Sequence, residues 1–386
     1  MSTIKVSNVQ NPSAASAAIT LDTNGQATLN GLAYPTSGSL SGRNRIINGD
    51  MRIDQRNAGA SVTVSTTTGY TLDRWRAGAS QNSKYSVQQN AGSVTPPAGF
   101  INYLGVTSLS AYSVISTDFF GLLQPIEGFN FSDFGWGSAL AIPVILSFWV
   151  RSSLTGTFGG SIQNSAQNRS YPFSYTISSA NTWEQKTILI PGDTTGTWLT
   201  NNNVGAYLTI ALGYGSTYSG TAGAWVATNT ISVTGATSVV GTNGATFYIT
   251  GVQLEAGSVA TPFERRSYGQ ELALCQRYYQ IIASKDADHT IANMAFHSGT
   301  SCYGSVRFAT SMRASPTLDS VTGTNYYKCY VAGVDRYSNT VYLDTSASSM
   351  QGVEVQTVLS TSATAGQCGF FRLNSDNAYI NLTAEL

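Results

Sequence analysis

Short runs in which apolar and polar residues alternate recur throughout this chain, separated by turns rich in glycine and asparagine. Between residues 144 and 151, for example, Val144, Leu146, Phe148 and Val150 share one face of an extended segment. A period of two places one face of a strand in a core and the other face outside it. Aromatic residues, which favour strands, make up 11% of the chain. The pattern predicts an all-β fold.

Length and local composition divide the chain into segments. A chain of 386 residues is long enough for two or three domains. Residues 1–45 contain no tryptophan and few large apolar residues, whereas residues 46–265 hold all six tryptophans. We therefore expect an extended N-terminal segment over 1–45 and a jelly-roll-like β-sandwich over 46–265. A smaller C-terminal β-sandwich is expected over 284–386, because short strand-like runs return there.

The N-terminal segment carries one strong local signal. In residues 18–30, Asn24 and Gly25 lie between two short alternating runs. Both residues tolerate the positive φ angles of a two-residue hairpin turn, so the sequence predicts a β-hairpin. One hairpin is only marginally stable in water, and we expect this segment to gain order from a partner or from sister chains.

Two further signals lie near the end of the central segment. The apolar phase changes at Gly251, which predicts a β-bulge. Ser267 and Gln270 then have the spacing of a capping box, and apolar residues recur at helical intervals as far as Ile282. The sequence therefore predicts a connecting helix over residues 266–283.

Charge and cysteine content exclude several classes of protein. Only 10% of residues are charged, with 20 basic and 20 acidic side chains, so we expect no nucleic-acid partner. The most apolar stretch, 140–150, is short and contains Pro143, so no membrane insertion is expected. The N-terminus has no secretory-signal pattern, and the four cysteines form no C-x-x-C pair. We expect free, mostly buried thiols, and neither a metal site nor a cofactor.

Several segments resemble the carbohydrate-binding-module-like β-sandwiches of bacteriophage tail fibres. The motifs NRIINGDMRIDQR at 44–56 and YTLDRW at 70–75 resemble the opening of that module, and ITGVQLEAG at 249–257 resembles its closing strand. Further similar segments are ATPFE at 260–264, ELALCQRYY at 271–279, MRASPT at 312–317, LTAEL at 382–386 and STIKVSNV at 2–9.

This resemblance implies a homotrimeric tail protein of the virion that is assembled in the host cytoplasm. Residues 1–45 would then anchor it to other virion tail proteins, and residues 284–386 would form a receptor-binding tip. The implied function is nonenzymatic attachment to a glycan or protein of the host surface. Two alternatives stay open, a glycan-depolymerising tail enzyme and a purely structural fibre that serves as a tail adaptor or decorates the capsid.

Glycan binding directs attention to aromatic residues, because the apolar faces of sugars stack on aromatic rings. Tyrosine also offers a broad, stiff contact area at a low cost in entropy. At each position, core packing or contact between subunits is the competing interpretation. The candidate binding residues are Tyr326, Tyr327, Tyr330, Tyr337 and Tyr342 in the C-terminal segment, and Trp198, Tyr214 and Trp225, with Trp136 and Tyr218, in the central segment.

Catalytic and metal-binding patterns are weaker. Glycoside hydrolysis commonly needs two carboxylates on either side of the scissile bond. The sequence offers Asp118, Glu127, Asp133, Glu184 and Asp193 but does not establish their geometry. His289 and His297, with the aspartates beside His289, lack the ligand spacing of a calcium or zinc site, so we interpret them as parts of solvated loops.

Overall fold

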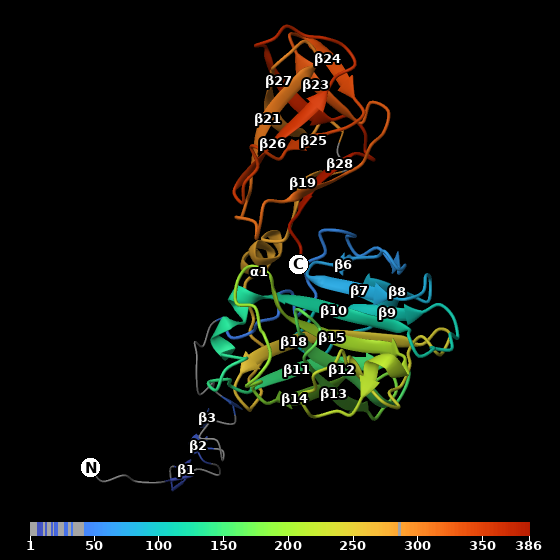
Figure 1. The fold of residues 1–386 in the computed structure, drawn as a ribbon, viewed down its shortest axis with the longest axis vertical. Coiled ribbons are helices and arrows are strands. Elements are labelled where there is room, and N and C mark those ends of the chain that lie inside the picture. Colours follow the sequence, from blue (N-terminus) through green and yellow to red (C-terminus); the bar gives the residue numbers. More distant parts are fainter. Residues whose placement is uncertain are drawn as a thin grey trace, which may run out of the picture. The chain divides into compact units, whose positions relative to one another are not determined.

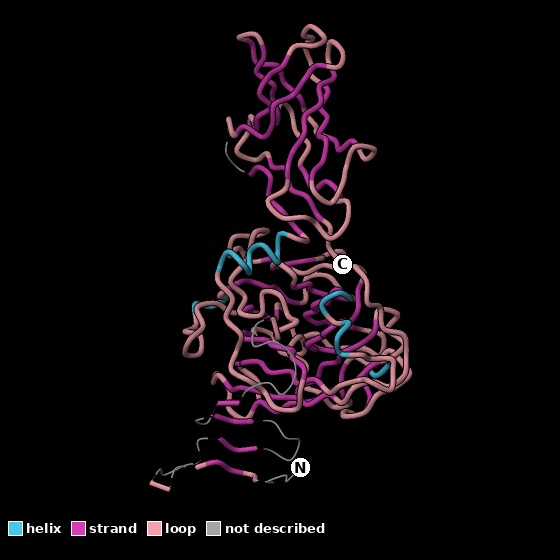
Figure 2. The backbone as a smooth tube through the Cα atoms, turned by 90° about the vertical axis from the view of Figure 1, so that its left-hand side faces the viewer, coloured by secondary structure: helices cyan, strands magenta, loops and turns pink. Residues whose placement is uncertain are grey.

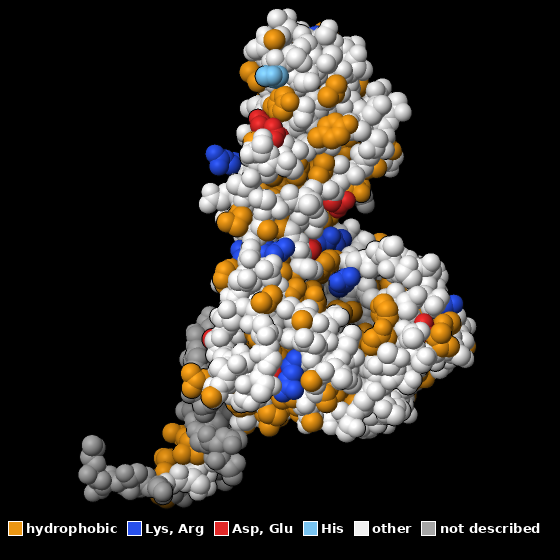
Figure 3. All heavy atoms as spheres, viewed as in Figure 1, with side chains coloured by type: hydrophobic (Ala, Val, Ile, Leu, Met, Phe, Trp, Pro, Cys, Tyr) orange, Lys and Arg blue, Asp and Glu red, His pale blue; other side chains and the backbone are white. Residues whose placement is uncertain are grey.

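The computed structural model describes residues 6–10, 12–13, 17, 19–21, 27–29, 32–33, 42–284 and 287–386. It contains two compact units, residues 1–266 and 267–386 (Figure 1). Strands dominate both units, as predicted, and helical segments are few and short (Figure 2). Charged side chains are sparse on the face of the molecule that Figure 3 shows.

The first unit is built around two six-stranded antiparallel sheets. The first sheet has, in spatial order, β13 (Ser170–Ile177), β12 (Gly156–Asn164), β15 (Val204–Tyr214), β10 (Phe119–Glu127), β7 (Trp75–Ala79) and β6 (Tyr70–Leu72). The second sheet has β14 (Glu184–Ile190), β11 (Val144–Ser152), β18 (Thr246–Ala256), β9 (Leu104–Ser108), β8 (Tyr85–Gln89) and β5 (Val62–Thr63).

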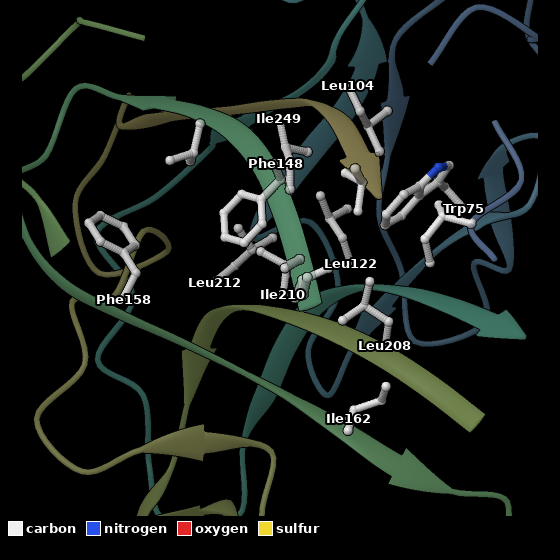
Figure 4. Close-up of a cluster of buried hydrophobic side chains, with 14 of the residues drawn as sticks. Trp75, Leu104, Leu122, Phe148, Phe158, Ile162, Leu208, Ile210, Leu212 and Ile249 are labelled. Atoms are coloured by element: carbon white, nitrogen blue, oxygen red, sulfur yellow. The ribbon is translucent and has the colours of Figure 1, made fainter. Parts of the chain in front are cut away.

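The inner faces of these two sheets share one hydrophobic core, which makes the unit a β-sandwich. Phe148 of β11 and Ile210 of β15 belong to this core and point into the same cluster (Figure 4). Trp75 is fully buried there and donates a hydrogen bond from Nε1 to the carbonyl oxygen of Asn48 at 3.0 Å. The predicted core face of β11 is confirmed, since Val144, Leu146, Phe148 and Val150 all belong to this core. Ile145 and Ser147, on the other face of the strand, are buried as well.

Shorter elements complete the first unit. They are the 3₁₀ turns η1 (Ala91–Ser93), η2 (Gly128–Asn130), η3 (Ser132–Phe134) and η4 (Ser216–Tyr218), and the parallel pair β16 (Ser219–Gly220) and β17 (Ser232–Val233).

The N-terminal segment contributes a four-stranded sheet of β1 (Asn8–Val9), β2 (Ile19–Leu21), β3 (Ala27–Leu29) and β4 (Leu32–Ala33). β2 pairs antiparallel with β3, as predicted for a hairpin, but Ile19 lies opposite Leu29, a register one residue away from that of a two-residue turn at Asn24 and Gly25. Its predicted turn at Asn24 and Gly25 lies outside the described residues.

The predicted bulge at Gly251 is present. The register between β11 and β18 shifts between Ser147 and Trp149, because Ser147 lies opposite Gln253 and Trp149 opposite Thr250. Gly251 adopts a φ of +62°, and a Cβ atom there would lie 2.6 Å from Cζ of Phe100. Glycine at this position therefore satisfies both a backbone and a packing requirement.

Replacing Gly251 by alanine is expected to destabilise the first unit by about 2 to 4 kcal/mol, because left-handed strain and overpacking against Phe100 add together. Gly235→Ala is the matched control, since Gly235 has a φ of +79° but nothing within 4 Å of its Cβ position. The control measures the strain alone, at about 1 to 2 kcal/mol. Urea unfolding followed by tryptophan fluorescence compares the two, and equal losses would contradict the packing argument.

The second unit begins with α1 (Tyr268–Gln276) and contains two sheets. The seven-stranded sheet has β24 (Val334–Ser338), β23 (Tyr327–Val331), β27 (Cys368–Leu373), β20 (Thr290–Phe296), β21 (Ser301–Arg307), β26 (Gly352–Val358) and β25 (Tyr342–Asp344). The three-stranded sheet has β19 (Tyr279–Ser284), β28 (Tyr379–Thr383) and β22 (Thr317–Ser320). Residues from both sheets share a second hydrophobic core.

The capping box is confirmed, but the predicted extent of the helix is wrong. The side chain of Ser267 accepts a hydrogen bond from the Gln270 amide, and the side chain of Gln270 accepts one from the Ser267 amide. The helix ends at Gln276, and residues 279–284 form β19 instead. Antiparallel pairing with β28 satisfies the backbone of these residues, and this tertiary pairing overrides their helical spacing.

Three of the four cysteines, Cys275, Cys302 and Cys329, are buried, in line with the expectation of mostly buried thiols, whereas Cys368 is exposed. None of the described helices is long and apolar enough to cross a membrane.

Candidate functional site

A recess with a volume of about 210 Å³ opens on the first sheet of the first unit. We call it the outer recess, because the strand residues that line it belong to the face turned away from the core. Its lining residues are Arg76, Gly78, Phe119, Leu123, Gln167, Tyr214, Tyr218, Asn229 and Ile231.

Strand register brings the floor of the outer recess together. Leu123 of β10 lies opposite Arg76 of β7, and Phe119 of β10 lies opposite Tyr214 of β15. Between them Gly121 lies opposite Gly78, so the centre of the floor carries no side chains. A Cβ atom at Gly121 would lie 2.7 Å from the hydroxyl oxygen of Tyr214. Gly121 therefore creates the space that the tyrosine ring enters, whereas a Cβ atom at Gly78 would lie 3.2 Å from Cδ1 of Leu123.

Three aromatic rings form the wall of the outer recess. Two of them, Phe119 and Tyr214, belong to the strands of the floor, and the third is Tyr218. Tyr218, from η4, meets Phe119 edge to face at a centroid distance of 6.1 Å and meets Tyr214 in the same way at 6.3 Å. Burial raises the pKa of the Tyr214 hydroxyl, and the nearby Tyr218 raises it further. The Tyr214 hydroxyl therefore stays protonated at neutral pH and can donate a hydrogen bond.

Polar side chains enter from the loops and from β7. Nε2 of Gln163 donates to Oδ1 of Asn229 at 2.8 Å, which leaves the Asn229 amide group to donate. Gln167 comes from the loop between β12 and β13, and Arg76 is exposed. Aromatic faces beside amide and guanidinium groups are the chemistry that binds a polar ligand with apolar faces, such as a sugar ring.

Asp118 precedes Phe119 in the chain and does not line the outer recess, but hydrogen bonds hold its carboxylate in place. Its carboxylate accepts hydrogen bonds from the Ser80 hydroxyl at 2.8 Å, the Tyr112 hydroxyl at 2.8 Å and the Ile115 amide at 3.0 Å. Burial acts to raise the pKa of Asp118, but these hydrogen bonds outweigh it and lower the pKa overall. The ionised carboxylate thus fixes the chain immediately before Phe119.

A second depression, of about 520 Å³, adjoins the outer recess through the shared residue Tyr214. Its lining residues are Tyr112, Ser113, Val114, Ile115, Ser116, Tyr214, Gly215, Ser216, Ala236, Ser238 and Gly241.

The second unit presents a different aromatic surface. Tyr330 of β23 lies opposite Phe370 of β27, and their side chains are 39% and 46% exposed. The guanidinium of Arg372 lies 5.8 Å from the Tyr330 ring centroid and 5.4 Å from that of Phe370. Tyr337 and Tyr342 share this side of the seven-stranded sheet by strand alternation. These four aromatic residues are the outer aromatic face.

The predicted binding residues thus separate into exposed and buried sets. Tyr330 and Tyr342 are exposed, and Tyr337 is half-buried. Tyr326 is half-buried and packs against the core of the second unit. Tyr327 is fully buried, so the prediction that it contacts a receptor is wrong. Alternation explains this, because adjacent residues of a strand face opposite sides of the sheet.

In the central unit, Tyr214 lines the outer recess, whereas the tryptophans pack elsewhere. Trp198 is 7% exposed and donates from Nε1 to Asp193 at 3.0 Å, so its prediction as an accessible stacking platform is wrong. Its ring lies 4.9 Å from Trp136 and 5.5 Å from Trp225, which is half-buried. These tryptophans fill one part of the core rather than a binding surface.

Sequence reasoning missed most of the outer recess. Phe119, Arg76 and Asn229 come from segments that carry no motif, and only strand pairing and the loop near β17 bring them together. The one available signal was the alternation in β10, which places Phe119 and Leu123 on the side opposite Phe120 and Leu122.

The candidate catalytic carboxylates are dispersed, and none of them lines the outer recess. Asp118 is held as described above, and Glu127 is buried. Asp133 pairs with Arg45, Glu184 with Lys186, and Asp193 with Arg169. Among the described residues, no group of three or more histidine, cysteine or acidic side chains is placed to hold a metal ion.

No model of a known protein family matches the sequence, and it has no match among curated proteins. Similar solved structures include a putative sugar-binding protein from Bacteroides thetaiotaomicron, at 12% identity and a TM-score of 0.31, over 56% of this chain and 100% of that chain. The enzymatically active domain of tailspike protein 4 from bacteriophage CBA120 is 13% identical with a TM-score of 0.30, over 50% of this chain and 21% of that one.

A carbohydrate-binding module solved with β-1,4-galactotriose is 12% identical with a TM-score of 0.28, over 56% of this chain and 99% of that one. These likenesses are low in both identity and TM-score. The assignment of the first unit as a two-sheet antiparallel β-sandwich therefore rests on its own strand order and core.

Proposed function

We propose that this protein is a nonenzymatic tail-fibre protein of a bacteriophage that attaches the virion to a glycan of the host surface. The observation that carries the proposal is the outer recess, where Phe119, Tyr214 and Tyr218 stand beside the polar side chains of Arg76 and Asn229. The resemblance of residues 44–56 and 249–257 to phage-fibre modules supports its place in a tail.

The proposal extends to assembly. A homotrimer anchored through residues 1–45 to other tail proteins would present three outer recesses and three outer aromatic faces at once. Several weak contacts then act together, and their avidity exceeds the affinity of any one contact. The outer aromatic face of the second unit, around Tyr330 and Phe370, is the proposed tip surface because its rings are exposed.

Tyr218→Ala tests the glycan proposal. The purified full-length protein is passed over immobilised surface polysaccharides isolated from a panel of bacterial strains, and retention and new reducing ends are measured together. Because an aromatic wall supplies much of the contact area for a sugar, the variant is expected to lose at least about tenfold in affinity. Tyr268→Ala is the control, since Tyr268 is 59% exposed and does not line the outer recess.

The readouts separate the three functional classes. Retention without new reducing ends supports a binding fibre, and new reducing ends would establish a glycan-cleaving enzyme instead. Absence of retention over the whole panel would favour a structural fibre. Light scattering on the same preparation tests the trimer, which requires a mass three times that of the chain.

A further inference from the structure

Several hydrogen-bond donors line the outer recess. Among the described residues that line it, Arg76 alone is charged, and a guanidinium offers five N–H groups and no acceptor. Asn229 has its carbonyl oxygen engaged by Gln163 and offers its amide hydrogens. The Tyr214 hydroxyl is neutral at pH 7, as an ordinary phenol is, and can also donate. Gln167 supplies both donors and an acceptor.

Negative charge is missing from the same place. Within the described part of the chain, no carboxylate lies within ion-pair distance of Arg76. Asp118 stands behind the wall, but its carboxylate accepts hydrogen bonds from Ser80, Tyr112 and Ile115 and is not among the lining groups. A cation that has no ion-pair partner and lines the same recess as aromatic rings is most strongly complemented by an anionic ligand.

We propose, on the basis of the glycan-binding function above, that the outer recess binds an acidic sugar whose carboxylate pairs with Arg76. The planar guanidinium can meet both carboxylate oxygens at once, a geometry that lysine cannot reproduce. Tyr218 and Phe119 contact the apolar faces of the sugar ring, and Asn229 donates to its hydroxyl oxygens. The ligand class is therefore a uronic acid or a similar carboxylated sugar within the host glycan.

Saturation-transfer difference NMR on the full-length protein tests this ligand class. The probes are glucuronate, galacturonate and N-acetylneuraminate, with glucose and galactose as neutral counterparts at the same concentration. At least one acidic sugar is expected to bind the wild-type protein more tightly than the neutral sugars. Arg76→Gln is expected to weaken that binding about tenfold, because it removes a charge-assisted contact. Arg76→Lys should bind more tightly than Arg76→Gln but less tightly than the wild type, because lysine keeps the positive charge but lacks the planar guanidinium that can contact both carboxylate oxygens.

Arg307→Gln is the matched control, because Arg307 is an exposed arginine of β21 in the second unit. It should leave the binding of the acidic sugar unchanged. Raising the salt concentration should weaken wild-type binding and have less effect on Arg76→Gln, since screening acts on the exposed charge.

Other outcomes would overturn the inference in distinguishable ways. Equal binding of neutral and acidic sugars, unchanged in Arg76→Gln, would refute the acidic ligand but leave glycan binding intact. Full displacement of the sugar by inorganic phosphate at the same concentration would reduce the recess to a general anion site. Binding of none of the five sugars would overturn the acidic ligand together with the glycan-binding role of the recess.

Discussion

Replacing Asp193 by alanine is expected to destabilise the first unit by about 3 kcal/mol. This value is at the low end of the cost of breaking a buried ion pair, because Arg169 is partly exposed. The Asp193 carboxylate is 1% exposed and receives hydrogen bonds from Nε of Arg169 at 2.9 Å and from Nε1 of Trp198 at 3.0 Å. Its loss leaves the Arg169 cation, 19% exposed, without its ion-pair partner, and it leaves the buried Trp198 N–H only its longer hydrogen bond, of 3.3 Å, to the carbonyl oxygen of Thr195.

Tryptophan fluorescence measures this effect in the first unit alone, since all six tryptophans precede residue 266. The variant should unfold at a lower urea concentration with an unchanged slope. Glu184→Ala is the control, because Glu184 pairs with Lys186 near the surface, with side chains 18% and 17% exposed. Its expected loss is below about 1 kcal/mol. Comparable losses for the two variants would contradict a special role of the buried pair.

The contribution of Asp193 should also depend on pH. Burial acts to raise its pKa, but Arg169 and Trp198 together lower it below the ordinary value. A carboxylate whose folded-state pKa is depressed stabilises fully above its unfolded pKa of about 3.9, and the contribution is lost as the pH falls through the folded pKa. The difference between wild type and Asp193→Ala should therefore be constant above about pH 5 and shrink below pH 4. A difference that grows on acidification would overturn this account.

Tyr327→Ala is expected to cost the second unit about 3 to 5 kcal/mol, whereas Tyr330→Ala should cost less than about 1 kcal/mol. Tyr327 is fully buried, stacks on Phe371 at a centroid distance of 6.0 Å and donates from its hydroxyl to the carbonyl oxygen of Val321 at 2.6 Å. Tyr330, three residues further along β23, is 39% exposed. The two variants remove the same side chain from opposite faces of one strand.

Amide hydrogen exchange over residues 267–386 measures this difference, because the second unit contains no tryptophan. Tyr327→Phe, which removes only the hydroxyl, should cost about 1 to 3 kcal/mol by leaving the Val321 carbonyl short of a donor. If Tyr330→Ala lowers protection as much as Tyr327→Ala does, the assignment of Tyr330 to an exposed binding face is wrong. If Tyr330→Ala is retained less on an immobilised glycan while its amide hydrogens stay as protected as in the wild type, the result would support the proposal that the outer aromatic face is the tip surface.

Local sequence chemistry was sufficient for several features. The alternation at 144–150 predicted which residues of β11 enter the core, because the period of a strand is a property of the backbone. The change of phase at Gly251 predicted the bulge, because one extra residue in a strand turns every following side chain to the opposite face of the sheet. The capping box between Ser267 and Gln270 is equally local, as its bonds join residues three apart.

Other features depend on contacts that no local pattern encodes. The helix after Ser267 ends early because residues 279–284 pair with β28, about 100 residues later in the chain. Strand alternation places Tyr327 and Tyr330 on opposite faces of β23, but only the packing of the second core decides that Tyr327 is the buried residue and Tyr330 the exposed one. Composition marked Trp198 as a candidate platform, but packing against Trp136 and Trp225 placed it in the core.

The all-β class, the alternation of strand faces and the local bulge and cap thus follow from residues that are neighbours along the chain, because backbone geometry alone relates them. The outer recess follows from residues that are neighbours only in the folded protein. Arg76, Phe119, Tyr214 and Asn229 span more than 150 positions, and they meet because β7, β10 and β15 lie side by side in register beneath the loop that carries Asn229. Long-range pairing decides which surface can bind a ligand, since it sets which outward side chains stand together.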